Sequence, residues 1–254
     1  MSRHWTQGRY LILDTETTGL IPETDRVVEL ATHSVDLAAG TVTPVFDQLI
    51  HPGRPIPPEA SAIHHLVDRD VTNAPPIEQV WAAFAPILAQ HDAVVAHNAR
   101  FDRAFLPPTT PPWICTLRLA RHLWPEAPKH TNQVLRYWLG LEVDAPHPHR
   151  ALDDTRVTAA LFQALVPVLA RTVSLTTPAE VEAWAERPVA LLTVPLGKYK
   201  GQSWTAVPAD YLRWAAKTWE DPDLLWNVHH ALGPPLPSRT FPARPSVARS
   251  EALP

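Results

Sequence analysis

Two carboxylates follow directly on the first apolar run of the chain, and they restrict what its N-terminal part can form. Residues 10–13 have the composition of a buried strand, and Asp14 and Glu16 stand at its end. Side chains two residues apart lie on the same face of a strand. Two adjacent anions cost stability unless a cation neutralises them, and hard divalent ions prefer such oxygen ligands. An Asp-x-Glu spacing alone is more often a solvated strand end, so a metal site requires further ligands elsewhere.

The next 160 or so residues are predicted to form strands first and then strands that alternate with helices. Short apolar runs bounded by turn residues predict four further strands, at 26–35, 42–50, 93–97 and 113–115. Apolar residues at helical spacing predict helices at 57–66, 77–90, 116–124, 131–139 and 151–169, and a short helix that ends at 105. The first three strands can form a meander. Strands followed by alternating helices indicate an α/β layer fold.

Length and composition exclude several classes of protein. The 254 residues accommodate one large domain, or one domain with a smaller module. With 45% apolar and 19% charged residues the composition is globular, and no run approaches the roughly 18 apolar residues of a membrane span. The first ten residues are polar where a signal peptide would be apolar, so we expect a cytoplasmic protein without membrane contact. A single cysteine, Cys115, excludes an internal disulfide and a multi-cysteine zinc site.

The chain carries 22 basic and 26 acidic residues, a net charge of −4. This balance argues against a protein that coats nucleic acid through bulk positive potential, although local patches can still bind it.

The pattern changes after residue 171. We expect a first domain over 9–171, a linker with a short helix over 172–189, and a small module over 190–232. The module is predicted to contain a hairpin at 191–204 centred on Gly197-Lys-Tyr-Lys-Gly201, helices at 208–219 and 221–232, and a packed trio of Trp204, Trp214 and Trp219. Residues 233–254 contain six prolines and no periodic apolar face, which predicts a disordered tail.

Two later segments supply further acidic groups: His97-Asn-Ala-Arg-Phe-Asp102 and His149-Arg-Ala-Leu-Asp-Asp154. Together with Asp14-Thr-Glu16-Thr-Thr-Gly they match, in order, three motifs of the DEDDh 3'→5' exonuclease family (DnaQ-like), which the chain resembles. The Gly197–Gly201 segment stands where the exodeoxyribonuclease X subfamily has it and general proofreading exonucleases lack it. The resemblance covers about residues 9–230, with Leu196 in place of the usual Phe and His65 where many relatives have Gly.

The resemblance implies a ribonuclease H-like fold, in which a mixed five-stranded sheet carries helices on both faces and the active site lies at one end of the central strands. It also implies stepwise hydrolysis of the 3'-terminal phosphodiester with two divalent ions, Mg²⁺ with Mn²⁺ also accepted. Its metal ligands correspond to Asp14, Glu16, Asp102 and Asp154 here, with Asp14 bridging both ions. The charges agree, since four carboxylates balance two doubly charged cations that can activate a water and stabilise a leaving oxygen.

The same resemblance gives His149 the role of general base, and an imidazole with a pKa near 6.5 suits proton transfer at neutral pH. Pro146 and Pro148 flank His147, so this segment is predicted to be an irregular loop that can carry His149 into place when substrate is bound. His147 is the competing candidate. Its spacing to Asp154 is seven residues instead of five, which favours His149.

Eight further residues are candidates for nucleic-acid binding, and most of them have a plainer alternative. Leu20 can instead pack within its loop, Asn98 can cap the short helix, and Arg150 can belong to a solvated face. His64 can be an ordinary helix histidine, while the segment around Lys198 can be an ordinary charged turn or combine phosphate contact with base stacking. The full set is Thr17, Thr18, Leu20, His64, Asn98, Arg150, Lys198 and Lys200.

The combined expectation is a 3'→5' exodeoxyribonuclease that acts on DNA 3' ends in repair or end processing. Single-stranded ends are the first expected substrate, and duplex ends and protein partners are left open. One alternative is an RNA-trimming DEDDh enzyme, which differs in how its pocket treats the 2'-hydroxyl. The other is a non-catalytic DNA-end binder, against which the intact set of four carboxylates and His149 argues.

Overall fold

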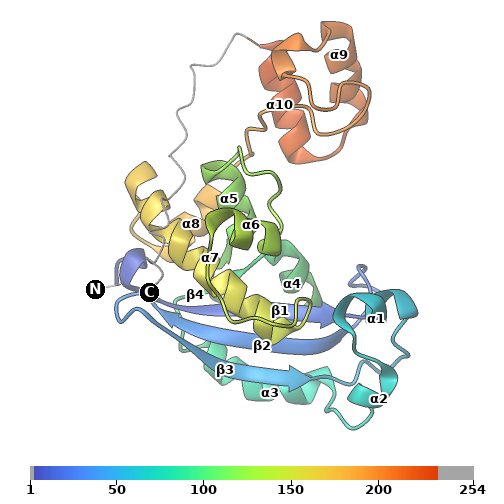
Figure 1. Cartoon of the computed structure of the whole chain (residues 1–254), viewed down its shortest axis with the longest axis vertical. Coiled ribbons are helices and arrows are strands. Elements are labelled where there is room, and N and C mark those ends of the chain that lie inside the picture. Colours follow the sequence, from blue (N-terminus) through green and yellow to red (C-terminus); the bar gives the residue numbers. More distant parts are fainter. Residues whose placement is uncertain (1–2, 234–254) are drawn as a thin grey trace, which may run out of the picture.

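The computed structural model describes residues 3–233, so the expected tail lies outside the described residues apart from Gly233. All five predicted strands are present and form one sheet in the order β3-β2-β1-β4-β5 (Figure 1). β1 pairs antiparallel with β2 and β2 with β3, whereas β1, β4 and β5 run parallel. The sheet is therefore mixed and five-stranded, as predicted. The strands are β1 (Arg9–Thr17), β2 (Val27–Asp36), β3 (Thr41–Leu49), β4 (Ala93–Ala96) and β5 (Trp113–Cys115).

Helices occupy the predicted segments, and no helix within residues 3–233 is long and apolar enough to cross a membrane. The helices of the larger part of the chain are η1 (Trp5–Gln7), α1 (Pro58–His64), α2 (Asp68–Val71), α3 (Ile77–Leu88), α4 (Ala99–Phe105), α5 (Thr116–Leu123), α6 (Asn132–Leu139), α7 (Ala151–Thr172) and α8 (Pro178–Ala185). The C-terminal part adds η2 (Trp204–Ala206), α9 (Ala209–Thr218) and α10 (Pro222–Leu232). The one-turn helix α2 is an addition to the predicted set.

Alternate residues of β1 enter two separate cores. Tyr10 and Ile12 are fully buried in the core that includes α7, and the Tyr10 ring meets Phe162 of α7 edge-on. Leu11 and Leu13 are buried in the second core, against α3 and α4. Since side chains alternate along a strand, the even-numbered positions that continue past residue 12 also face α7. The two predicted carboxylates occupy those positions.

The first strand ends later than predicted. β1 continues through Thr17 because its pairing with β2 continues to Thr17 opposite Val27, with a register shift between Glu16 and Thr17. The predicted hairpin at 191–204 was also too regular: it consists of a single antiparallel bridge between Thr193 and Ser203 around a turn. Both backbone groups of Val194 bond across the turn, with its N–H donating to Gln202 O and its carbonyl oxygen accepting from the Gly201 N–H.

The segment 172–189 contains the expected short helix, and this helix packs on the larger part of the chain. Val181 and Ala185 of α8 are buried in the α7 core. Trp5 is almost fully buried and binds the far side of the segment, with its Nε1 donating to Leu175 O at 2.9 Å and its backbone N–H donating to Thr176 O at 3.0 Å. Helix α8 is therefore part of the sheet domain, which comprises residues 3–189.

Residues 190–232, called the C-terminal module below, have a core of their own, and Figure 1 shows them at one end of the molecule, away from the sheet. Trp204 is buried in that core and meets the Trp219 ring edge-on, as predicted. Trp214 differs from the prediction, because half of its surface is exposed. The core residues are Val194, Trp204, Val207, Leu212, Ala215 and Val228.

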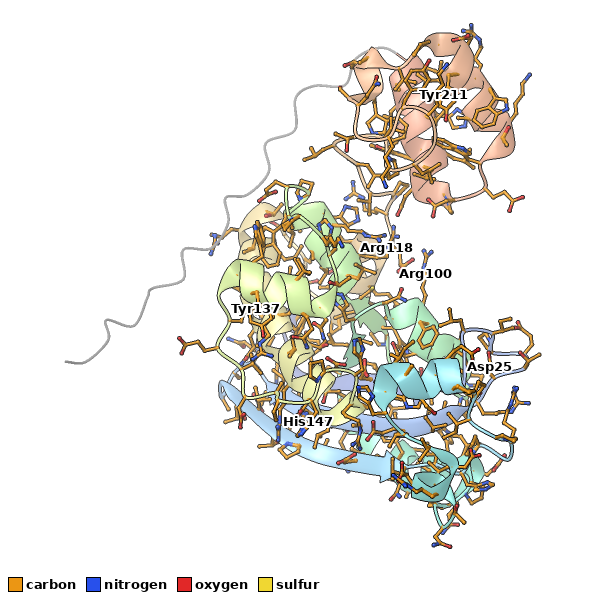
Figure 2. The ribbon with its side chains drawn as sticks, turned by 45° about the vertical axis from the view of Figure 1, so that its right-hand side comes forward. Asp25, Arg100, Arg118, Tyr137, His147 and Tyr211 are labelled. Atoms are coloured by element: carbon orange, nitrogen blue, oxygen red, sulfur yellow. The ribbon has the colours of Figure 1, made fainter. Side chains whose placement is uncertain are left out.

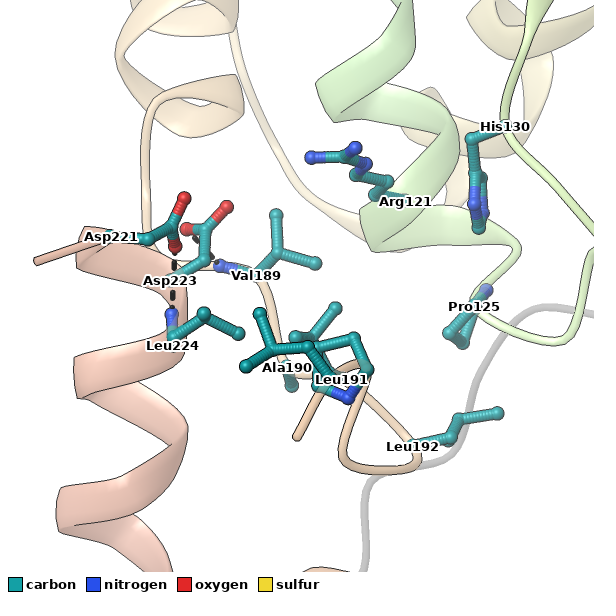
Figure 3. Close-up of a pocket in the computed structure, with 12 residues that line it drawn as sticks. Arg121, Pro125, His130, Val189, Ala190, Leu191, Leu192, Asp221, Asp223 and Leu224 are labelled. Atoms are coloured by element: carbon teal, nitrogen blue, oxygen red, sulfur yellow. Dashed lines mark hydrogen bonds between the residues drawn. The ribbon is translucent and has the colours of Figure 1, made fainter. Parts of the chain in front are cut away.

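A buried ion pair fixes the C-terminal module to α5. Arg118 Nη1 and Nη2 donate to Asp223 Oδ2 and Oδ1 at 3.0 and 3.2 Å, and Arg118 also donates to the carbonyl oxygens of Ala185 and Arg187. Both partners of the pair are buried. A cavity of about 360 Å³ lies beside this contact, between Arg121 and His130 on one side and residues 189–196 and α10 on the other (Figure 3).

Candidate active site

Three of the predicted metal ligands converge at the end of β1. One carboxylate oxygen each of Asp14, Glu16 and Asp154 lie within 4.8 Å of one another, and all three side chains are half-buried. Asp14 and Glu16 share the face of β1 that looks toward α7, and Asp154 projects from the first turn of α7. The spacing of two residues on a strand and the helix start after residue 150 thus bring the groups together.

Asp102 approaches the same strand end from α4. Its side chain is 98% buried, and its Oδ1 accepts hydrogen bonds from the Thr15 backbone N–H at 3.1 Å and from Thr15 Oγ1 at 2.8 Å. Asp102 is outside the three-residue cluster, although its charge is the second-largest influence on the pKa of Asp14. The structure therefore places all four predicted ligands around β1, with Asp102 on the side that faces α4.

The carboxylates hold one another in a state that favours protonation. Burial, followed by the charges of Asp102, Glu16 and Asp154, raises the pKa of Asp14 well above its usual range. Burial and the charge of Asp154 raise the pKa of Glu16 to about 9, and burial raises that of Asp102 to about 7. Burial also raises the pKa of Asp154. An oxygen-only donor set with this much uncompensated repulsion fits a hard divalent cation.

A fifth buried carboxylate, Glu29, was not identified from the sequence. It stands opposite Glu16 in the β1–β2 register, is 1% exposed, and adds its charge to the cluster around Glu16. Arg150 compensates Glu29 with an Nη2–Oε1 distance of 2.6 Å, and the Ala151 N–H at the start of α7 donates to Oε2. The signal that could have revealed it is an acidic residue inside an apolar strand pattern, since such groups are buried only when paired.

His149 lies on the loop before α7, as predicted, and is tied to the cluster through its backbone. Its N–H donates to Asp154 Oδ2 at 2.9 Å, and it adopts a left-handed conformation with φ of 61°. The residue is exposed. His147 is engaged elsewhere: its N–H donates to Asp153 Oδ2 at 2.8 Å, and its Nδ1 lies 3.3 Å from the same oxygen. Of the two histidines, His149 alone contacts a residue of the carboxylate cluster.

The residues that follow the two β1 carboxylates form a fixed turn with an apolar tip. Thr17 and Thr18 are buried, where Thr17 Oγ1 donates to Gly19 O at 2.6 Å and Thr18 N–H donates to Arg26 O at 2.8 Å. Leu20 is 77% exposed, so it does not pack within its loop. An exposed leucine beside a polar site is available to contact a base.

His64 and Asn98 occupy different surroundings. His64 is 99% buried, and its Nδ1 accepts from the Leu66 N–H at 3.1 Å. Burial lowers its pKa, and the Thr17 backbone opposes this effect, which places the ring beside the end of β1. Asn98 stands at the N-cap of α4 with φ of 73°, but its side chain makes no capping hydrogen bond. The capping alternative for Asn98 was therefore wrong.

The three predicted cations are separated. The Arg150 guanidinium is held by Glu29 through Nε and Nη2, and its side chain is 40% exposed. The ion pair contradicts the solvated-face alternative, and phosphate binding by Arg150 stays a prediction. Lys198 and Lys200 are exposed in the turn of the C-terminal module, which is distinct from the sheet domain that carries the carboxylates. Figure 2 shows Arg100 and Arg118 between the module, marked by Tyr211, and the sheet.

Comparison with known proteins accounts for this arrangement. The RNase_T exonuclease family model matches residues 11–162. Exodeoxyribonuclease 10 of Escherichia coli K12 is 37% identical over 229 residues, which cover 87% of this chain and 97% of the relative. The DNA polymerase III subunit epsilon of Treponema pallidum is 33% identical over 62% of this chain and 76% of its own.

A solved structure, exonuclease X in complex with 5' overhanging duplex DNA, superimposes with a TM-score of 0.58 at 37% identity over 68% of this chain and 99% of that one. The ribonuclease H-like fold and the resemblance to exodeoxyribonuclease X are thereby confirmed. The carboxylate cluster also agrees with the divalent metal use of the family. On its motifs, its fold and these similarities, the chain belongs to the RNase T exonuclease family, within its DEDDh group.

Proposed function

We propose that the protein is a Mg²⁺-dependent 3'→5' exodeoxyribonuclease that removes nucleotides from DNA 3' ends in repair or end processing. The observation that carries the proposal is the convergence of Asp14, Glu16 and Asp154 within 4.8 Å, at raised pKa, in a chain 37% identical to exodeoxyribonuclease 10. A relative bound to duplex DNA with a 5' overhang makes a recessed 3' end a substrate to test first.

The four carboxylates Asp14, Glu16, Asp102 and Asp154 would hold two divalent ions, with Mn²⁺ accepted in place of Mg²⁺. When bound, the ions supply charge stabilisation at the attacking and leaving oxygens of the scissile phosphate. His149 accepts a proton from the attacking water, and its backbone bond to Asp154 keeps the imidazole beside the cluster. The exposed Leu20 contacts the terminal base, and the hydrogen-bonded turn at Thr17 and Thr18 fixes the loop that carries it.

The test uses end-labelled DNA and RNA oligonucleotides of one sequence, with Mg²⁺ and with the full chain. We expect a ladder of products shortened from the 3' end of DNA, and a loss of roughly 10³-fold or more in turnover for Asp14→Asn and Asp154→Asn. Asp144→Asn is the matched control, because Asp144 is an exposed carboxylate on the loop before α7. Shortening of RNA alone, or Asp14→Asn turnover near that of the wild type, would overturn the proposal.

Calorimetric titration with Mn²⁺ separates loss of metal from loss of chemistry. The two Asn variants are expected to bind Mn²⁺ at least tenfold more weakly than the wild type, since each removes one anionic ligand.

A further inference from the structure

The positive charge of the chain is unevenly distributed. The first 189 residues of the sequence carry 15 basic and 21 acidic residues, and the described part of this segment, 3–189, is the sheet domain. Three of the four lysines of the chain, Lys198, Lys200 and Lys217, lie in the C-terminal module, and the fourth is Lys129. A net negative catalytic domain attracts a polyanion weakly, so a basic surface elsewhere in the chain would add to DNA binding.

Two of the four acidic residues of the C-terminal module are already engaged in structural contacts. Asp223 is buried in the pair with Arg118, and Asp221 caps α10 by accepting from the Leu224 N–H at 2.9 Å. Asp210 and Glu220 remain exposed. They face an excess of exposed cations, which are Lys198, Lys200, Arg213 and Lys217.

Aromatic rings lie among these cations. The rings of Tyr199 and Tyr211 meet edge-on with centroids 4.7 Å apart, and Trp214 follows with its centroid 5.1 Å from that of Tyr211. Trp214 is 50% exposed, and Lys198 Nζ lies 5.4 Å from the centre of the Tyr199 ring. Leu212 and Ala215 of α9 are buried in the module core, and Tyr199 and Tyr211 pack against it. Trp214 belongs to neither group, so packing in that core does not explain it.

The turn at residues 197–201 packs against Tyr211 through Gly197. Gly197 has φ of 75°, and a Cβ at that position would lie 2.5 Å from the Tyr211 hydroxyl. Only glycine allows the backbone of the turn to approach Tyr211 this closely. The two lysines of the turn are therefore held at a fixed place relative to the rings.

Helix α9 extends the same surface. Tyr211, Trp214 and Lys217 follow one another at intervals of three residues, and so lie along one stripe of the helix. Arg213 and Lys217 are four residues apart, a spacing at which like charges destabilise a helix unless an anion lies between them.

We propose that Tyr199, Tyr211 and Trp214, with Lys198, Lys200 and Lys217, form a stacking platform for single-stranded DNA outside the active site. Bases stack on the exposed face of Trp214, and the lysines contact the phosphates on either side. Alternation of rings and cations is the pattern of sequence-tolerant single-strand binding, whereas duplex binding needs cations without stacking rings. The buried Arg118–Asp223 pair attaches the module that carries the platform to α5 of the sheet domain.

The platform is tested by the binding of the full chain to fluorescent oligothymidine of about 16 nucleotides in EDTA, where no cleavage occurs. Trp214→Ala is expected to raise Kd by about 5- to 150-fold, the range for one stacked base. The triple variant Lys198→Gln/Lys200→Gln/Lys217→Gln is expected to lower the salt slope of log Kd by about 2, at about 0.7 for each lost phosphate contact. Tyr137→Ala and Lys129→Gln are the matched controls, since Tyr137 is an aromatic residue 74% exposed in the sheet domain.

An abasic oligomer of the same length distinguishes stacking from a structural role of Trp214. Wild type is expected to bind it as weakly as Trp214→Ala binds oligothymidine, and the substitution is expected to cause no further loss. Unchanged Kd and salt slope in the variants, at unchanged Tm, would overturn the proposal, and so would equal losses on blunt duplex DNA. The choice of DNA as the ligand of the platform rests on the proposed function, so cleavage with Mg²⁺ is measured separately. Trp214-dependent binding without cleavage would overturn the proposed activity and leave the platform in place.

Discussion

Glu29 and Arg150 form an ion pair directly beside the carboxylate cluster. Glu29 is buried opposite Glu16 in the sheet, and Arg150 is the residue that follows His149. The pair therefore connects the strand that faces the cluster with the loop that carries the proposed general base. The charge of Glu29 raises the pKa of Asp14 and Glu16, and the charge of Arg150 opposes this effect at Glu16.

Arg150→Met is expected to lower the free energy of unfolding by about 2 kcal/mol. Breaking a fully buried pair costs about 3–5 kcal/mol, and the Arg150 side chain is 40% exposed, which reduces the effect. Urea unfolding measures it. Arg69→Met is the control, because the Arg69 side chain is 87% exposed in its pair with Asp70 and its loss should cost less than about 0.5 kcal/mol. A double variant with Glu29→Gln should recover part of the loss, and equal effects of Arg150→Met and Arg69→Met would contradict the assignment.

The raised pKa values predict how the metal-free protein responds to pH. Acids with a pKa raised in the folded state stabilise it at low pH, and this stability is lost as the pH rises through the folded values, about 7 for Asp102 and about 9 for Glu16. His33 and His97, whose pKa burial lowers to about 4, destabilise the fold only below about 6.5. Between pH 6.5 and 9 the carboxylates therefore determine how stability changes with pH, and stability falls as the pH rises.

The melting temperature of the metal-free protein is expected to fall by about 5 °C or more between pH 6.5 and pH 9. Mg²⁺ should remove most of the decline, because a cation stabilises the ionised carboxylates. Asp14→Asn should reduce it by removing one member of the cluster. A melting temperature that rises with pH in EDTA would contradict the repulsion among the carboxylates that the geometry indicates.

Local pattern marked Asp14 and Glu16 as candidates, and the motifs shared with the DEDDh family were needed to add Asp154 to them. Asp14 and Glu16 follow an apolar run, and Asp154 lies in the first turn of a long amphipathic helix. The period of two along β1 is enough to place Asp14 and Glu16 on a common face. The position of α7 against that face then follows from the burial of Tyr10 and Ile12 on the same side.

Features that depend on long-range pairing were harder to predict. The extension of β1 to Thr17 comes from its pairing with β2, and the partner of Arg150 lies 121 residues away. The Gly197–Gly201 segment has the turn residues of a hairpin, but it forms a single bridge and its backbone lies close to Tyr211, a contact that a local pattern does not contain. For the same reason Trp214 was expected inside the module and is found at its surface.

His149→Ala is expected to reduce turnover by roughly 10²-fold or more while DNA affinity in EDTA stays within about twofold, since a proton acceptor is removed and no ligand. His147→Ala is the matched variant. It loses a contact with Asp153, whose Oδ1 still accepts from Arg156 at 2.9 Å, so its turnover should fall less than about threefold. Single-turnover cleavage of a labelled oligonucleotide measures both. Greater damage in His147→Ala would transfer the role of general base to His147.

Truncation tests where the nuclease domain ends. A fragment of residues 1–187 retains α8, whereas one of residues 1–171 loses the buried Val181 and Ala185 and both hydrogen bonds of Trp5 to this segment. One buried valine contributes about 1.5–3 kcal/mol and each hydrogen bond about 1 kcal/mol, so the shorter fragment should be less stable by about 3 kcal/mol or more. Urea unfolding compares the two. The longer fragment should also cut DNA, because the carboxylates and His149 lie within it, with weaker binding to oligothymidine than the full chain. Equal stability of the two fragments would show that α8 is a linker helix and that the domain ends at residue 171.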